Sequence, residues 1–110
     1  MLPREHRIVE PGDFRHVVRR GDKCVTDHFI AYRVGDGRAR VGIIATNKCG
    51  NAIVRNTLRR RTRAICRELV DDGTLTGDVV VRFRCEGTTP DFETLKSEIN
   101  LCIRRWSVVA

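Results

Sequence analysis

The sequence predicts a single α+β domain in which helices pack on a small sheet, and three observations support this. Two stretches carry apolar residues at the spacing of a core-facing helix, one within 52–69 and one within 92–106. Three short stretches rich in β-branched and other apolar residues are typical of strands, at 28–34, 40–46 and 79–84. The length of 110 residues suits one modest core, so we expect a single domain over the whole chain, residues 1–110.

The expected elements follow the order α-β-β-β-α-β-α when a very short strand near 23–25 is counted. Residues 1–9 are basic, and we expect them to be loosely attached. The sequence Glu-Pro-Gly-Asp at 10–13 predicts a helix start, because proline suits the first helical position and an acid suits the first turn; Gly21 ends this helix. The sequence Gly-Asp-Gly at 35–37 predicts a hairpin between the two strands that flank it.

The two long helices have recognisable starts and apolar stripes. Asn51 is placed to cap the first helix, which should end before Asp71. Most of the apolar residues of that helix fall on one stripe; they are Ile53, Val54, Leu58, Ile65, Cys66 and Leu69. The last helix starts after Thr-Thr-Pro-Asp at 88–91, and its stripe consists of Phe92, Leu95, Ile99, Cys102, Ile103 and Trp106.

The formal net charge of +7 is unevenly distributed. No Asp or Glu occurs in residues 37–67, which contain Arg38, Arg40, Lys48, Arg55, Arg59, Arg60, Arg61, Arg63 and Arg67. Such a local field favours phosphate backbones or anionic membrane surfaces. No apolar run approaches the ~20 residues of a membrane span, and the N-terminus lacks the apolar core of a signal peptide, so we expect a cytoplasmic protein without a membrane partner.

The cysteines are odd in number, scattered, and never at metal-ligand spacing; they are Cys24, Cys49, Cys66, Cys85 and Cys102. We therefore expect reduced packing residues, without a disulfide scaffold or a zinc site.

The sequence offers no convincing catalytic group. His6, His16 and His28 lie in different expected elements without an obvious carboxylate or nucleophile partner, and no glycine-rich phosphate loop follows a strand. The pair Asp71–Asp72 falls in a turn between helix and strand, where acids are ordinary. We predict neither a catalytic residue nor a metal site in the protein.

The basic helix is the stronger signal. Its arginines lie opposite the apolar stripe, except for Arg61 on the apolar flank, where its stem can pack while its head reaches water. The ordinary alternative is a solvated charged face, but such a face usually mixes signs to gain ion pairs one turn apart. Like charges repel by a few tenths of a kcal/mol per pair, and a bound polyanion relieves that repulsion. Arginine also suits bidentate phosphate contacts, which favours nucleic-acid binding.

Two aromatic residues permit two interpretations. Phe14 and Tyr32 can be plain core residues, or they can line a groove with Val18 in which unpaired bases lie against apolar surface. The pattern alone leaves both interpretations open. Trp106 is expected to anchor the last helix.

The segment GNAIVRNTLRRRTR at 50–63 resembles the signature helix of the bacterial ribonuclease P protein subunit. That family carries Arg-Asn-x-x-(Lys/Arg)-Arg-x-x-Arg after a Gly-Asn-Ala lead, and the matching residues here are Arg55, Asn56, Arg59, Arg60 and Arg63. The resemblance spans nearly the whole chain, including Asp13–Phe14, the strand 29–34 and the strand 77–81. The sequence departs from the family pattern at Asn47, Cys49, Val18 and Thr57, which weakens a stacking role for Val18.

The resemblance implies a four-stranded sheet, a left-handed β-α-β crossover and a role in an endonuclease whose RNA subunit does the cutting. It implies that Mg²⁺ is bound mainly by that RNA, and that the partners are the catalytic RNA and precursor tRNA, with no obligate protein partner. The residues implied to bind the catalytic RNA are Lys48, Asn51, Arg55, Asn56, Arg59, Arg60, Arg63 and Arg67. The cleft implied to hold the 5′ leader is lined by Phe14, Val18 and Tyr32.

The sequence therefore favours the protein subunit of a tRNA-maturing ribozyme, which lowers the Mg²⁺ requirement by offsetting phosphate repulsion. A general RNA-binding or ribosomal-type module without a role in cleavage is the first alternative. A duplex-DNA binder that uses the basic helix in a major groove and an autonomous protein nuclease are weaker alternatives.

Overall fold

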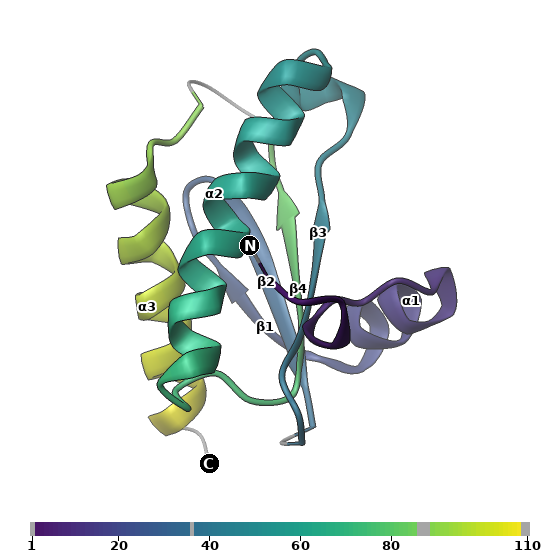
Figure 1. Cartoon of the computed structure of the whole chain (residues 1–110), viewed down its shortest axis with the longest axis vertical. Helices are drawn as coiled ribbons and strands as arrows, with labels where there is room; N and C mark the ends of the chain where they lie inside the picture. The colour runs from purple at the N-terminus through teal and green to yellow at the C-terminus, as the bar shows by residue number, and fades with distance from the viewer. Residues whose placement is uncertain (1, 36, 86–88, 109–110) are drawn as a thin grey trace.

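The structure is a computed structural model that describes residues 2–35, 37–85 and 89–108. Its helices are α1 (Pro11–Arg20), α2 (Ala52–Asp71) and α3 (Phe92–Val108), and its strands are β1 (Asp22–Val25), β2 (Phe29–Val34), β3 (Arg40–Ile44) and β4 (Asp78–Phe83) (Figure 1). Two short 3-10 turns, η1 (Arg4–His6) and η2 (Asn47–Cys49), precede α1 and α2. The predicted α+β class, the single small sheet and the order of elements are confirmed.

The four strands form one mixed sheet in the order β1-β2-β4-β3. Strand β4 runs antiparallel to β2 and parallel to β3, so it lies between the two strands that the sequence Gly-Asp-Gly was expected to join as a hairpin. The hairpin prediction is therefore wrong. Instead, the Gly77 N–H donates to the Gly37 carbonyl oxygen at 2.9 Å, and the Arg40 N–H donates to the Gly77 carbonyl oxygen at 3.1 Å. Gly35 and Gly37 thus pack against the start of β4, where a side chain on Gly77 (φ +79°) would collide with Gly35.

The connection from β3 through α2 to β4 is left-handed. In Figure 1 both strands point upward, α2 lies in front of the sheet, and β4 lies to the left of β3. Parallel β-α-β units are right-handed in nearly all proteins, so this crossover is unusual. It agrees with the expectation drawn from the resemblance.

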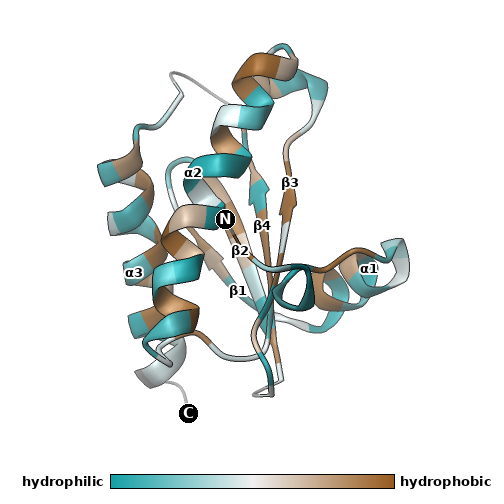
Figure 2. Cartoon of the chain, in the orientation of Figure 1, coloured by the Kyte–Doolittle hydropathy of each residue, from teal (hydrophilic) through white to brown (hydrophobic). Residues whose placement is uncertain are grey.

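Each face of the sheet carries its own core. The larger core packs α2 and α3 on one face and includes Phe29, Val81, Ile65 and Leu95. The smaller core packs α1 on the other face and consists of Ile8, Val17, Tyr32 and Val80, with Phe14 and Val18 at its border. Figure 2 shows hydrophobic residues along the strands between these two layers. Because alternate residues of β2 and β4 serve opposite faces, both strands are largely apolar.

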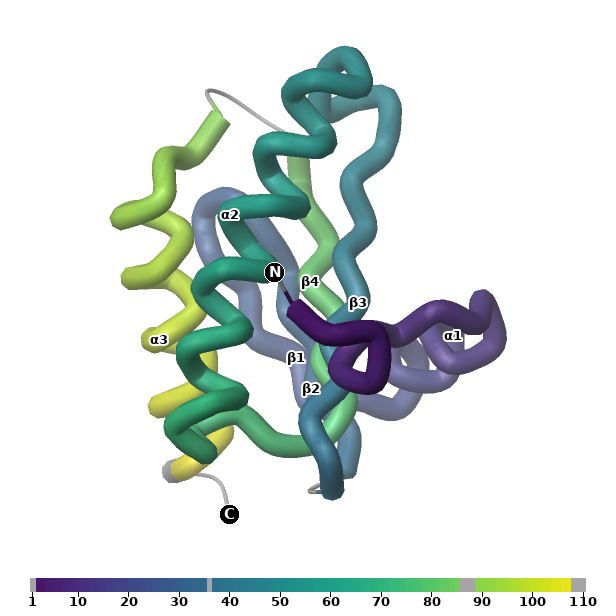
Figure 3. The backbone as a smooth tube through the Cα atoms, in the orientation of Figure 1, coloured from purple at the N-terminus to yellow at the C-terminus, as the bar shows by residue number. Residues whose placement is uncertain are grey.

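Residues 2–8 are well anchored, so the expectation that residues 1–9 are loosely attached is wrong for this part of the segment. Met1 lies outside the described residues. Leu2 is 1% exposed within the larger core, and Ile8 is 5% exposed within the smaller one. The Ile8 N–H donates to the Val41 carbonyl oxygen at 2.9 Å, and Arg7 forms a parallel bridge with Val41. The segment therefore passes over the edge of β3 between α2 and α1 (Figure 3). An open sheet edge exposes unpaired backbone groups, and this segment covers part of it.

Helix α2 begins as the sequence predicts. The Asn51 Oδ1 atom accepts a hydrogen bond from the Val54 N–H at 3.1 Å. The buried stripe continues through Leu58, Thr62, Ile65 and Cys66. Ile53 is the exception to the predicted stripe, since it is 75% exposed in the first turn.

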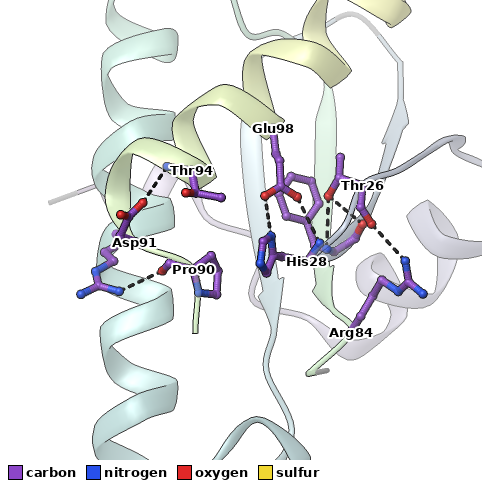
Figure 4. Close-up of polar contacts among 9 residues, drawn as sticks. Thr26, His28, Arg84, Pro90, Asp91, Thr94 and Glu98 are labelled. Carbon is purple, nitrogen blue, oxygen red and sulfur yellow. Dashed lines mark hydrogen bonds and ion pairs between the residues drawn. The ribbon is translucent and has the colours of Figure 1, made fainter. Parts of the chain in front are cut away.

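Helix α3 is fixed to β2 and α2 by polar contacts (Figure 4). His28 donates its backbone N–H to Glu98 Oε1 at 3.1 Å, and its Nδ1 lies 2.6 Å from Glu98 Oε2. Asp91 Oδ1 accepts the Thr94 N–H at 2.8 Å at the start of the helix. The Arg61 guanidinium donates to the Pro90 carbonyl oxygen at 2.9 Å, which explains why Arg61 points away from the other arginines of α2.

Cys49 and Cys85 form a disulfide, so the expectation that all five cysteines are reduced is wrong for this pair. Their separation of 36 residues hides the pairing from the sequence. The parallel strands β3 and β4 end at the same end of the sheet. Cys49 follows β3, and Cys85 follows β4. Cys24, Cys66 and Cys102 are free and buried, as predicted, and burial raises the pKa of the Cys66 thiol to about 12.

Reducing the Cys49–Cys85 bond should lower the free energy of unfolding by about 4 kcal/mol, because the bond restricts the unfolded chain across 36 residues. Urea unfolding with and without a thiol reductant measures this difference. The double variant Cys49→Ala/Cys85→Ala is the control and should not respond to the reductant. An equal response of the variant would assign the effect to other cysteines.

Replacing Gly42 by Ala should destabilise the fold by about 1–3 kcal/mol, because a Cβ atom there would collide with the Phe14 ring that lies on β3. Gly12→Ala is the matched control, since a Cβ at Gly12 meets nothing within 4 Å. Thermal unfolding of both variants checks this. If the two variants unfold alike, Phe14 does not rest on Gly42 in solution.

Candidate nucleic-acid interface

One face of α2 carries arginines that the fold holds at the surface. Arg60 and Arg67 are exposed, whereas Arg55, Arg59 and Arg63 are half-buried. Arg59 donates to the Ala45 carbonyl oxygen and to Asn56 Oδ1, both at 3.3 Å. Arg55 donates to Asn47 Oδ1 in η2. These contacts use only part of each guanidinium and hold both groups over the β3–α2 connection.

This arginine face has little acidic compensation. Arg67 lies 3.6 Å from Asp71, one turn further along the helix. Among the residues that the structure describes, no ion pair joins an acid to Arg55, Arg59, Arg60 or Arg63. Burial lowers the pKa of Arg63, and the neighbouring charges of Arg7 and Arg59 lower it further. The positive charges therefore face one another and solvent.

Other predicted RNA-binding residues lie at the start of α2. Lys48, Asn51 and Asn56 are all exposed. The carboxamide oxygen of Asn51 is occupied by the helix cap, so any contact with RNA would use its amide nitrogen. Gly50, at φ +130°, turns the chain between η2 and α2, where a larger residue would be strained. The structure thus groups Lys48 with the first turns of the arginine face.

A groove lies on the α1 side of the sheet, beyond the part that α1 covers. Its volume is about 540 Å³, and it is lined by Ile30, Thr46, Asn47, Lys48, Arg82, Phe83, Arg84 and Cys85. Ile30 and Arg82 are paired across β2 and β4. Asn47 both lines this groove and accepts the Arg55 hydrogen bond, so the groove and the arginine face meet at η2.

The three predicted cleft residues differ in accessibility. Phe14 and Val18 are half-buried, but Tyr32 is only 7% exposed and belongs to the core under α1. Phe14 lies on Gly42 of β3 rather than in the 540 Å³ groove. The open apolar surface beside α1 comes instead from Ile30, with Val25 47% exposed on the neighbouring strand.

Sequence reasoning missed Arg82 and Arg84 as members of this groove. Arg82 interrupts a run of valines in β4, and such a charge in an apolar strand could have indicated a functional face. Arg84 donates to the Thr26 carbonyl oxygen at 3.1 Å, which places it beside the β1–β2 turn (Figure 4). The groove therefore combines apolar strand surface with cationic walls.

Two of the three histidines have structural contacts in the described part of the chain. His28 binds Glu98, and His6 Nδ1 lies 2.7 Å from the Ala39 carbonyl oxygen, while His16 is exposed. The described residues contain no group of three or more His, Cys, Asp or Glu that could hold a metal ion. None of the described helices is long and apolar enough to cross a membrane.

Comparisons with known proteins agree with this geometry. The family profile for ribonuclease P matches residues 2–107. The ribonuclease P protein component of Clavibacter michiganensis is 30% identical over 96% of both chains, and that of Gluconacetobacter diazotrophicus is 31% identical over 98% of this chain and 97% of the other. The solved ribonuclease P protein of Thermotoga maritima superposes with a TM-score of 0.74 at 28% identity, covering 90% of this chain and 96% of the other. A solved ribonuclease P protein from Staphylococcus aureus has the same fold, with a TM-score of 0.81 at 20% identity, covering 94% of this chain and 89% of the other. The chain therefore belongs to the ribonuclease P protein family.

Proposed function

We propose that this chain is the RNA-binding subunit of a ribonuclease P in which the RNA subunit cuts the 5′ leader from precursor tRNA. The observation that carries the proposal is the arginine face of α2, which meets a cationic groove at η2. Among the described residues, no ion pair joins an acid to Arg55, Arg59, Arg60 or Arg63 of that face. Family membership supports RNA binding and a role in tRNA processing. We assign the protein to the cytoplasm, where its RNA partners are made.

The physical role is electrostatic. Two RNAs repel each other through their phosphates, and guanidinium groups between them reduce that repulsion while releasing counterions. The arginine face of α2 would contact the catalytic RNA, and the surface between α1 and the sheet would hold the leader. Mg²⁺ would be bound mainly by the RNA, as the family resemblance implies.

Reconstitution tests the proposal. A precursor tRNA is incubated with the catalytic RNA, with this protein, or with both, at low Mg²⁺ concentration. We expect cleavage only when both are present. Lack of stimulation would favour a general RNA-binding module, and cleavage by the protein alone would favour an autonomous nuclease.

The double variant Arg59→Ala/Arg60→Ala should bind the catalytic RNA more weakly and with a weaker dependence on salt. Each lost phosphate contact removes roughly 0.7–0.9 from the slope of log K against log salt. Titrations at several salt concentrations measure the slope. The control Arg104→Ala/Arg105→Ala removes two exposed arginines from α3 and should leave the slope unchanged. Equal slopes for both variants would mean that the α2 arginines face bulk water.

Arg82→Ala should weaken binding of a precursor tRNA that carries a leader more than binding of mature tRNA. The loss of one contact in the groove is worth about 1 kcal/mol, a roughly fivefold rise in Kd. Arg38→Ala, which removes an exposed charge at the opposite end of the sheet, is the control. An equal effect of Arg82→Ala on both RNAs would place the leader elsewhere.

A further inference from the structure

A second hollow lies at the β3 edge of the sheet, away from the groove described above. Its volume is about 470 Å³, and four separate segments line it. The N-terminal segment contributes Arg4 and Arg7, α2 contributes Arg63, and Phe14 with Gly42 forms part of its apolar wall. None of its lining residues is acidic.

The position of Arg7 in this hollow is determined by backbone contacts. Arg7 forms a bridge with Val41, and the next residue donates its N–H to the Val41 carbonyl oxygen at 2.9 Å. One residue earlier, His6 Nδ1 lies 2.7 Å from the Ala39 carbonyl oxygen. Contacts on both sides of Arg7 therefore hold its backbone against β3.

Two guanidiniums of the hollow lack compensation. The Nε atom of Arg7 is buried and has no hydrogen-bond partner. Arg63 is half-buried, and its pKa is lowered by burial and by the charges of Arg7 and Arg59. Among the described residues, no ion pair joins an acid to Arg7 or Arg63; Glu5 lies 3.9 Å from His6, and Asp13 lies 3.3 Å from Arg40. A buried donor without a partner and two neighbouring like charges both favour an anion as the missing partner.

We propose that this hollow binds one phosphate group of an RNA chain, held by Arg7 and Arg63 with Arg4 at its rim. The proposal rests on the RNA-binding function above and adds to it a site that the N-terminal segment completes. Guanidinium forks match the oxygens of a phosphate, and the backbone contacts at Arg7 keep its guanidinium at the wall of the hollow, with an Nε–H that still lacks a partner. The site extends the arginine face of α2 around the β3 edge toward α1.

Inorganic phosphate is the first probe. NMR signals of the arginine Nε–H groups are followed while phosphate replaces chloride at constant ionic strength. We expect the Arg7 signal to shift and saturate, and the Arg63→Ala variant to weaken this binding about tenfold. Arg104→Ala, on α3, should bind phosphate as the unmodified protein does. A shift of Arg7 that never saturates, or that Arg63→Ala leaves unchanged, would overturn the proposal.

RNA binding by Arg7 variants identifies the source of the phosphate. We expect Arg7→Ala to weaken binding about fivefold, either to the catalytic RNA or to leader-bearing precursor tRNA, and the affected RNA supplies the phosphate. Arg7→Lys keeps the charge but lacks the Nε–H, so it should recover only part of the affinity. Circular dichroism spectra that match the unmodified protein ensure that a weaker variant is still folded.

The experiments with RNA distinguish a failure of the phosphate site from a failure of the proposed function. If Arg7→Ala binds both RNAs normally while Arg59→Ala/Arg60→Ala does not, the phosphate site is wrong and the proposed function stands. If neither variant affects binding to either RNA, both proposals are wrong.

Discussion

The parallel pairing of β3 with β4 is the constraint on which the rest of the structure depends. It brings the C-terminal ends of the two strands to the same end of the sheet, where η2 follows β3 and Cys85 follows β4. The disulfide, the groove and the first turn of α2 all lie at that end of the sheet. Because α2 must connect the two strands, its apolar stripe packs on one face of the sheet and its arginines are left outside. The same pairing thus forms the core and places the charge.

The helical part of the fold could be predicted because its signals are local. Asn51 caps α2 through its own side chain, and the stripes of α2 and α3 repeat within a few residues. The arginine face follows from the same periodicity. The periodicity also predicts that Arg61 lies apart from the other arginines, and in the structure Arg61 donates to the Pro90 carbonyl oxygen.

Features that depend on contacts between distant residues could not be predicted. The sequence Gly-Asp-Gly at 35–37 is compatible with a hairpin, but the better partner for both flanking strands is β4, which lies some forty residues later in the chain. The N-terminal segment has no periodicity, yet Leu2 and Ile8 fill gaps on opposite faces of the sheet. Tyr32 in the candidate site is another example. The sequence alone does not distinguish an aromatic strand residue that α1 covers from one that α1 leaves exposed.

The arrangement of charge links the stability of this domain to the anion binding proposed above. Arg63 lies near Arg7 and Arg59, and their mutual repulsion raises the free energy of the folded state. In the unfolded chain Arg7 is far from Arg59 and Arg63, so folding itself creates much of this repulsion. An anion that binds only the folded state stabilises it by an amount that grows with the logarithm of its concentration above Kd. Under the proposed function, residues that cost stability in the free protein would contribute favourable energy in the complex with RNA, and a domain of 110 residues could then tolerate so one-sided a helix.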